Sequence, residues 1–108
     1  MDMDKRELKT LLAQGETLTV EFKSDAKGLP DRDLVATVVA MANTEGGRIL
    51  LGVEDDGAVT GTQPAHRNIA GLLALIANRT SPSVTVRAEL LAHEGKKVLS
   101  IVVPKSRG

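Results

Sequence analysis

An apolar segment that ends at two adjacent glycines constrains the fold of this chain more than any other feature. Residues 34–42 are apolar apart from one threonine, and Asp31 precedes them as a favourable residue for a helix start. Gly46 and Gly47 then permit a sharp turn into a short apolar strand at residues 48–53. The sequence therefore predicts a helix that is buried against a sheet and joined to one of its strands.

The rest of the pattern predicts two further helices and four further strands. Leucines recur at helical spacing near the start of the chain, whereas Leu18, Val20 and Phe22 alternate with polar residues and predict one buried strand face. Asp55-Asp56-Gly57 is typical of a hairpin turn. The predicted helices cover residues 3–14 and 64–80, and the predicted further strands cover 17–23, 58–61, 84–91 and 97–103. This order, αβαββαββ, predicts an α+β fold of one domain with a mixed or mostly antiparallel sheet.

Composition excludes several classes of function. The chain contains one phenylalanine, Phe22, and no tryptophan or tyrosine, so it lacks the aromatic platforms on which unpaired bases stack. Cysteine is absent, which excludes disulfides, thiolate metal sites and thiol catalysis. No basic and apolar leader is present, and the longest apolar run is far shorter than the ~20 residues of a membrane span. We therefore expect a cytoplasmic protein that does not enter a membrane.

Two stretches together resemble a known family. Residues 16–23 read Glu-x-x-x-x-Glu-Phe-Lys, and residues 40–57 contain Ala-x-Ala-Asn-Thr-x-Gly-Gly followed by Gly-Val-x-Asp-Asp-Gly. The pair resembles the hallmark of the Schlafen-like divergent Alba-type domain, and the resemblance extends over residues 16–103. Met41 replaces the usual Phe and keeps the position apolar. The resemblance implies a nucleic-acid-binding domain, DNA-directed in the first instance, of a transcriptional regulator. Such a domain binds duplex DNA or structured RNA by shape and phosphate contacts.

The glycine-rich motif allows two interpretations. Its residues suit a helix end and tight turns, because glycine adopts positive φ and asparagine bonds nearby backbone. Exposed amides beside tandem glycines also bind anions in proteins. The motif residues are Asn43, Thr44, Gly46, Gly47, Gly52, Asp56 and Gly57.

Three carboxylates form a second candidate site. Glu16, Glu21 and Asp55 resemble the set with which nuclease members of the Schlafen family hold divalent metal, so this alternative requires Mg²⁺ or Mn²⁺. In the other interpretation Glu21 pairs with Lys23 or Arg48 and the aspartates only shape a turn. Without the nuclease activity no cofactor is expected.

Basic residues are concentrated late in the chain. Residues 1–56 contain 7 basic and 12 acidic side chains, and residues 57–108 contain 7 and 2. Phosphate contacts dominate affinity for nucleic acids, so exposed cations are the candidate contacts. These are Lys23, Lys27, Arg48, Arg79, Lys96 and Lys97, with Arg67, Arg87, Lys105 and Arg107 as further members. His66 and His93 are far apart and are expected to be ordinary polar residues.

A third interpretation is a protein-interaction module that forms a homodimer. Zero net charge favours it, because nucleic-acid-binding domains are commonly basic. The chain ends soon after its last predicted strand, so residues 1–108 are also expected to be the N-terminal part of a longer regulator.

Overall fold

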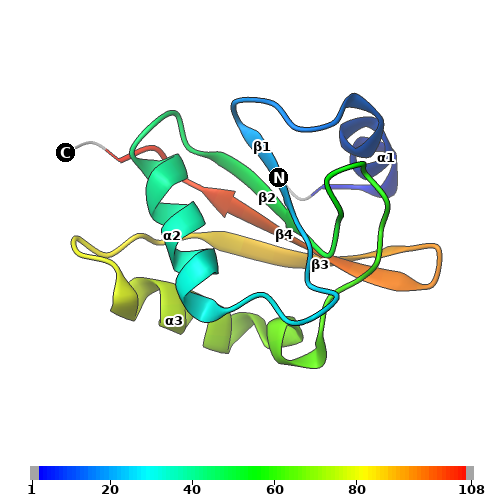
Figure 1. Cartoon of the computed structure of the whole chain (residues 1–108). Helices are drawn as coiled ribbons and strands as arrows, with labels where there is room; N and C mark the ends of the chain where they lie inside the picture. Colours follow the sequence, from blue (N-terminus) through cyan, green and yellow to red (C-terminus); the bar gives the residue numbers. More distant parts are fainter. Residues whose placement is uncertain (1–2, 107–108) are drawn as a thin grey trace.

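The chain folds into a mixed sheet with helices on both faces, as the computed structural model of residues 3–106 shows (Figure 1). The α+β class predicted from the sequence is confirmed. Within the described residues the elements are α1 (Lys5–Gln14), β1 (Val20–Lys23), α2 (Asp31–Ala42), β2 (Gly47–Leu51), the 3-10 helix η1 (Pro64–Arg67), α3 (Ile69–Arg79), β3 (Arg87–His93) and β4 (Lys96–Val103).

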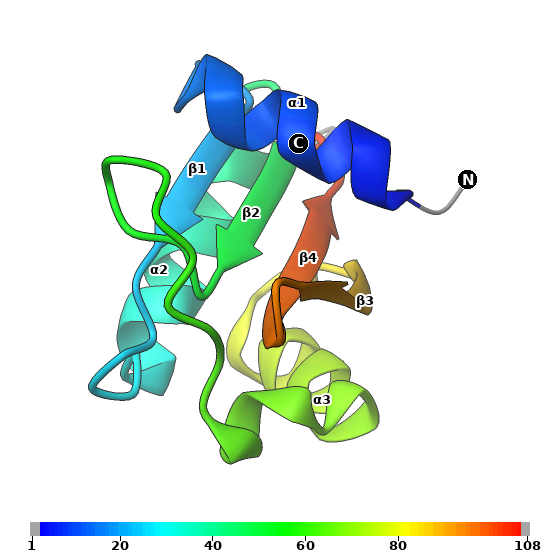
Figure 2. The same ribbon diagram turned by 90° about the vertical axis from the view of Figure 1, so that its right-hand side faces the viewer.

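The strands lie side by side in the order β1-β2-β4-β3 (Figure 2). β1 and β2 are parallel, with Glu21 opposite Ile49, and α2 is the crossover between them. The pairings of β2 with β4 and of β3 with β4 are antiparallel. The sheet is therefore mixed and mostly antiparallel, as predicted.

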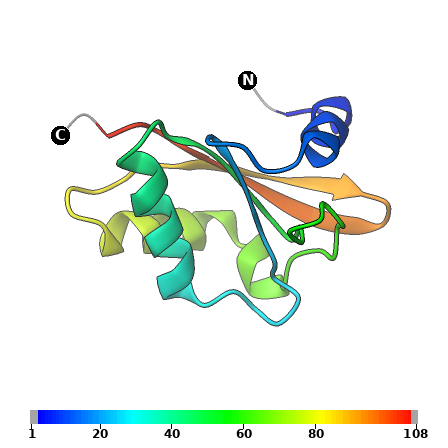
Figure 3. The same cartoon turned by 45° about the horizontal axis from the view of Figure 1, so that its top comes forward.

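The sheet separates two hydrophobic cores. α2 and α3 cover one face and α1 covers part of the other (Figure 3). The larger core packs residues such as Leu34 and Ile76 of the helices against Ile49 and Ile101 of the strands. The smaller core, beneath α1, contains Phe22, whose side chain is 2% exposed. None of the helices in the described part of the chain has the length and apolar character that a bilayer crossing requires.

Two sequence predictions about the strands were wrong in detail. Leu18 is 78% exposed, because Thr17 and Val20 form a bridge that closes a tight turn and the regular alternation begins only at Val20. Residues 58–61 contain only an isolated bridge, from Val59 to Val53, and no named strand, because their other backbone bonds converge on Gly52 and Glu54 at the turn after β2.

Helix α2 is less buried than its composition suggested. Leu34, Val38, Met41 and Ala42 are buried, and the apolar residues between them are partly or fully exposed. The spacing of the buried residues is that of one helix face on a sheet. The outer face of α2 therefore presents small side chains to solvent.

Candidate nucleic-acid interface

The glycine motif joins α2, β1 and β2 at one end of the sheet. Asn43 is the C-terminal cap of α2, and the Thr44 hydroxyl donates to the Met41 carbonyl over 3.0 Å. Gly47 has φ 143°, and a Cβ at this position would overlap the carbonyl oxygen of Thr19. A Cβ on Gly46, with φ 70°, would lie 2.6 Å from the carbonyl oxygen of Val103. Both glycines therefore allow backbones to approach closely.

The remaining motif residues shape the turn after β2. The Gly52 amide donates to the Lys23 carbonyl over 2.8 Å, which continues the contact between β1 and β2. Asp56 Oδ1 accepts from the Ala58 amide over 2.9 Å, and the Gly57 amide donates to the Glu54 carbonyl over 2.9 Å. These contacts give the motif a structural role throughout.

Two of the three predicted carboxylates are bonded to groups in or beside β1. Glu16 Oε2 accepts from the Phe22 amide over 2.9 Å, and Glu21 Oε2 lies 3.4 Å from Lys23 Nζ. Asp55 is exposed in the turn after β2. Within residues 3–106 no three His, Cys, Asp or Glu side chains are placed to hold a metal ion together.

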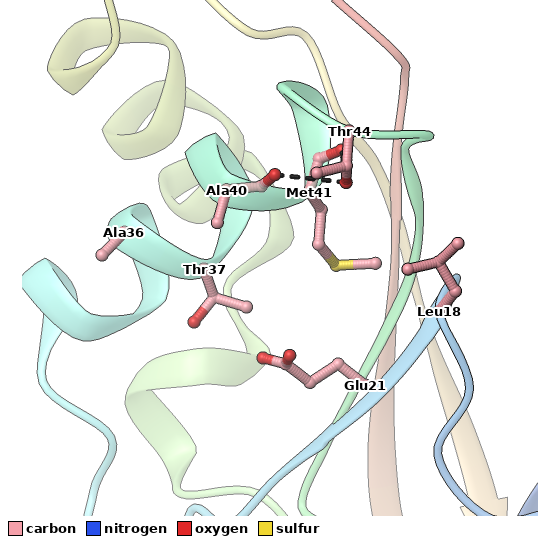
Figure 4. A pocket seen from close by; sticks show the side chains of 7 residues that line it. All are labelled: Leu18, Glu21, Ala36, Thr37, Ala40, Met41 and Thr44. Atoms are coloured by element: carbon pink, nitrogen blue, oxygen red, sulfur yellow. Dashed lines mark hydrogen bonds between the residues drawn. The ribbon is translucent and has the colours of Figure 1, made fainter.

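Glu21 instead lies on one side of a shallow groove between β1 and α2. The groove has a volume of about 370 Å³, and the Glu21 side chain points from β1 toward Thr37 of α2, while Leu18 lies at its rim (Figure 4). Ala36, Ala40 and Met41 supply the apolar lining.

Glu54, which was not predicted as a site residue, is the acidic residue that bonds across the turn after β2. The Thr60 hydroxyl donates to its Oε2. The bond from Thr60 and then a second from Ser24 lower the pKa of Glu54 below its ordinary value of 4.5. Its carboxylate thereby ties the turn to the chain that follows β1.

Four exposed basic residues gather around residues 61–63, and we refer to them as the cation cluster. The Thr62 amide donates to the Lys97 carbonyl over 3.0 Å, and a Cβ on Gly61 would lie 3.4 Å from the Lys96 side chain. Gln63 Nε2 donates to the Ala26 carbonyl over 2.9 Å, which brings the loop after β1 to the same place. The cluster consists of Lys27, Arg67, Lys96 and Lys97.

The side chains of the cation cluster are not paired with acidic side chains in the described residues. None of its four members forms an ion pair within residues 3–106, whereas Lys23 is paired with Glu21. Arg67 donates through one terminal nitrogen to the Thr62 carbonyl over 2.7 Å, which holds its guanidinium beside the chain of residues 61–63. All four members were named from the sequence as separate residues, and the structure places them on converging segments.

The other predicted cations lie away from this cluster. Arg48 of β2 and Arg87 of β3 are both paired with Val102 of β4, the strand between them. Their side chains therefore lie on the same face of the sheet, about 10 Å apart. Arg48 donates to the Ser100 hydroxyl over 2.6 Å, and Arg79 is exposed at the end of α3. Lys105 lies 3.5 Å from Glu45. Arg107 lies outside the described residues.

His66, which was expected to be an ordinary polar residue, has a buried ring that is bonded to a distant carboxylate. It is 7% exposed, and its Nδ1 lies 2.8 Å from Oδ2 of Asp25, which is fully buried. Asp25 lies 41 positions earlier in the chain, so no local pattern indicated this contact.

The comparisons with known proteins agree with this architecture. A family model described as Schlafen, AlbA_2 matches residues 16–108. The DIP2311 protein from Corynebacterium diphtheriae is 26% identical, with a TM-score of 0.69, over 94% of this chain and 22% of its own. The N-terminal domain of a RecG-related protein from Nitrosomonas europaea, whose name relates it to ATP-dependent DNA helicases, is 25% identical, with a TM-score of 0.60, over 97% of this chain and 74% of its own. No curated protein matches.

Proposed function

Because the chain belongs to the Schlafen, AlbA_2 family, we propose that it is a nucleic-acid-binding domain of a transcriptional regulator, which holds duplex DNA or structured RNA through phosphate contacts. The name of the RecG-related neighbour supports the DNA-directed version. The chain spans about a fifth of the DIP2311 protein, which supports a role as one module of a longer regulator.

The cation cluster is the observation that carries this proposal. Lys27, Arg67, Lys96 and Lys97 are exposed, come from three segments and have no acidic partner within residues 3–106. Such a group attracts a polyanion and releases its counterions on contact. The zero net charge of the chain is compatible with this, because a local surface and not the total charge meets the phosphates.

The buried position of Phe22 supports binding by phosphate contacts instead of base stacking. The chain has no tryptophan or tyrosine, and its one phenylalanine, Phe22, is 2% exposed beneath α1. Base-stacking proteins use exposed aromatic rings as platforms. We therefore expect little preference for unpaired bases and a strong dependence on salt.

The positions of the carboxylates favour nucleic-acid binding without hydrolysis. Phosphodiester hydrolysis by metal ions needs several oxygen ligands around one position. Glu16 is bonded to the β1 backbone and Glu21 is paired with Lys23, so two members of the proposed metal site already have other partners.

A gel-shift assay tests the proposal. Labelled duplex DNA and hairpin RNA are each incubated with the domain at low salt, with Mn²⁺ and then with a chelator. Retarded and intact nucleic acid in both conditions is the expected result. Mn²⁺-dependent fragments that disappear in Glu21→Gln would favour the nuclease instead. The absence of both retardation and cleavage would leave a homodimeric interaction module, which sizing by light scattering would detect.

A further inference from the structure

The two edges of the sheet are not equally protected. β1 is only four residues long, and the Phe22 amide on its outer side donates to the Glu16 carboxylate over 2.9 Å. β3, the strand at the other edge, has seven residues that pair with β4 in a continuous register without a bulge (Figure 2). It contains neither proline nor lysine, which commonly protect an edge. β3 therefore presents the longer and more open edge.

The outer side of β3 carries backbone groups that no described segment of the chain bonds. The turn at Glu94-Gly95, where both residues have positive φ, closes on the pair of His93 and Lys96. Alternate residues of β3, counted back from His93, therefore exchange bonds with β4, and the N–H and C=O groups of Ala88 and Leu90 point outward. Within residues 3–106 these outward groups have no backbone partner. Such a row of groups is a template for another strand.

The charges beside this edge are complementary to a second copy of themselves. Arg87 and Glu89 are two residues apart on β3, so they lie on one face of the sheet. If two β3 strands pair antiparallel about Ala88, Arg87 of each copy lies opposite Glu89 of the other. Opposite charges in this position stabilise a sheet, whereas pairing about Arg87 or Glu89 would place like charges opposite each other. The charges therefore select one register.

Both charged side chains are available for this contact. Neither Arg87 nor Glu89 forms an ion pair within residues 3–106. Glu89 accepts from the Met3 amide over 2.7 Å through Oε1, which leaves Oε2 for a partner. Charges on an edge strand discourage arbitrary partners, and here the two signs match only a strand with the same pattern.

We propose that two copies of the chain associate through β3 and join their sheets into one. The contact is isologous, because the Arg87–Glu89 pair occurs twice about the two-fold axis at Ala88. The outer edges of the joined sheet are then the two β1 strands, which Glu16 blocks, so association stops at two copies. The contact uses no member of the cation cluster and is independent of nucleic-acid binding. One strand edge buries less than the about 1,600 Å² of a standard interface, so we expect a dimer that dissociates on dilution.

Sedimentation velocity at increasing protein concentration tests the proposal. The mass of the unmodified chain should rise from 11.4 kDa toward twice that value as the concentration approaches about 1 mM. Ala88→Pro should remain a monomer, because it removes the outward N–H at the centre of the contact. An edge strand tolerates proline where the N–H faces solvent, and an unchanged unfolding temperature checks this.

Charge reversals test the register. Arg87→Glu or Glu89→Arg alone places like charges opposite each other twice, so each should raise the dissociation constant about tenfold or more. A mixture of these two variants should form a heterodimer, because every facing pair is again of opposite sign, and this result also shows that both variants fold. Arg32→Glu makes the same charge change on α2, away from β3, and should leave the dissociation constant unchanged (Figure 2).

Three results would overturn the proposal. The unmodified chain could stay monomeric up to about 1 mM. Ala88→Pro could dimerise as the unmodified chain does. The mixture of Arg87→Glu and Glu89→Arg could associate no better than either variant alone, which would exclude this register.

Discussion

Replacing Lys96 and Lys97 with glutamine should flatten the salt dependence of DNA binding. Both side chains are exposed at the β3–β4 hairpin, so their loss should change the free energy of unfolding by no more than about 0.5 kcal/mol. If all four members of the cation cluster contact phosphates, the slope of log affinity against log salt is about −3.6, and the double variant should give about −1.8.

The slopes translate into a large difference that a fluorescence anisotropy titration can measure. Between 50 and 200 mM salt, a slope of about −3.6 weakens binding roughly 150-fold, and a slope of about −1.8 weakens it roughly 12-fold. Arg79→Gln combined with Arg87→Gln is the matched control, since it removes the same charge from two exposed residues outside the cluster. An unchanged slope in the lysine variant, or an equal fall in the control, would refute the cluster as the interface.

Three further outcomes test the packing and the electrostatics. Gly47→Ala should lower the free energy of unfolding by more than about 2 kcal/mol in urea denaturation, whereas Gly28→Ala, with φ +81° and open space around it, should cost only about 1 kcal/mol of backbone strain. Asp25→Ala should cost about 3 kcal/mol or more, since two buried amides and an imidazole lose their acceptor. The lowered pKa of Glu54 stabilises the folded state above pH 4.5, and this stabilisation is lost as the pH falls through the folded-state pKa. In Glu54→Gln the urea midpoint should therefore decrease less steeply on acidification than in the unmodified chain.

The overall fold was predictable because the strongest signals are local. The apolar helix, the Gly46-Gly47 turn and the following strand depend on residues adjacent in sequence, and the structure has them as α2 and β2. Leu18 could not be placed correctly, because the alternation of β1 continues in the sequence through a tight turn that only the backbone reveals. Periodicity predicts a face only where the strand geometry persists.

The candidate sites depend on contacts between distant segments and were therefore only partly predictable. Lys96 and Lys97 are neighbours in sequence, but Lys27 joins them through the bond from Gln63 to Ala26, which spans 37 positions. The pairing of His66 with Asp25 spans 41 positions and has no motif. In both cases the residue types were visible in the sequence, whereas their convergence required the fold.

Glu16 shows how one residue can support two different functional interpretations. β1 is an edge strand, and the Phe22 amide donates to Glu16 Oε2 instead of to a neighbouring strand. Blocking an edge amide in this way protects the sheet from pairing with other chains. Loss of activity in Glu16→Ala would therefore not establish a metal ligand, because the same change exposes the edge. Glu21→Gln is the more decisive test of hydrolysis, since it removes only a half-exposed ion pair with Lys23.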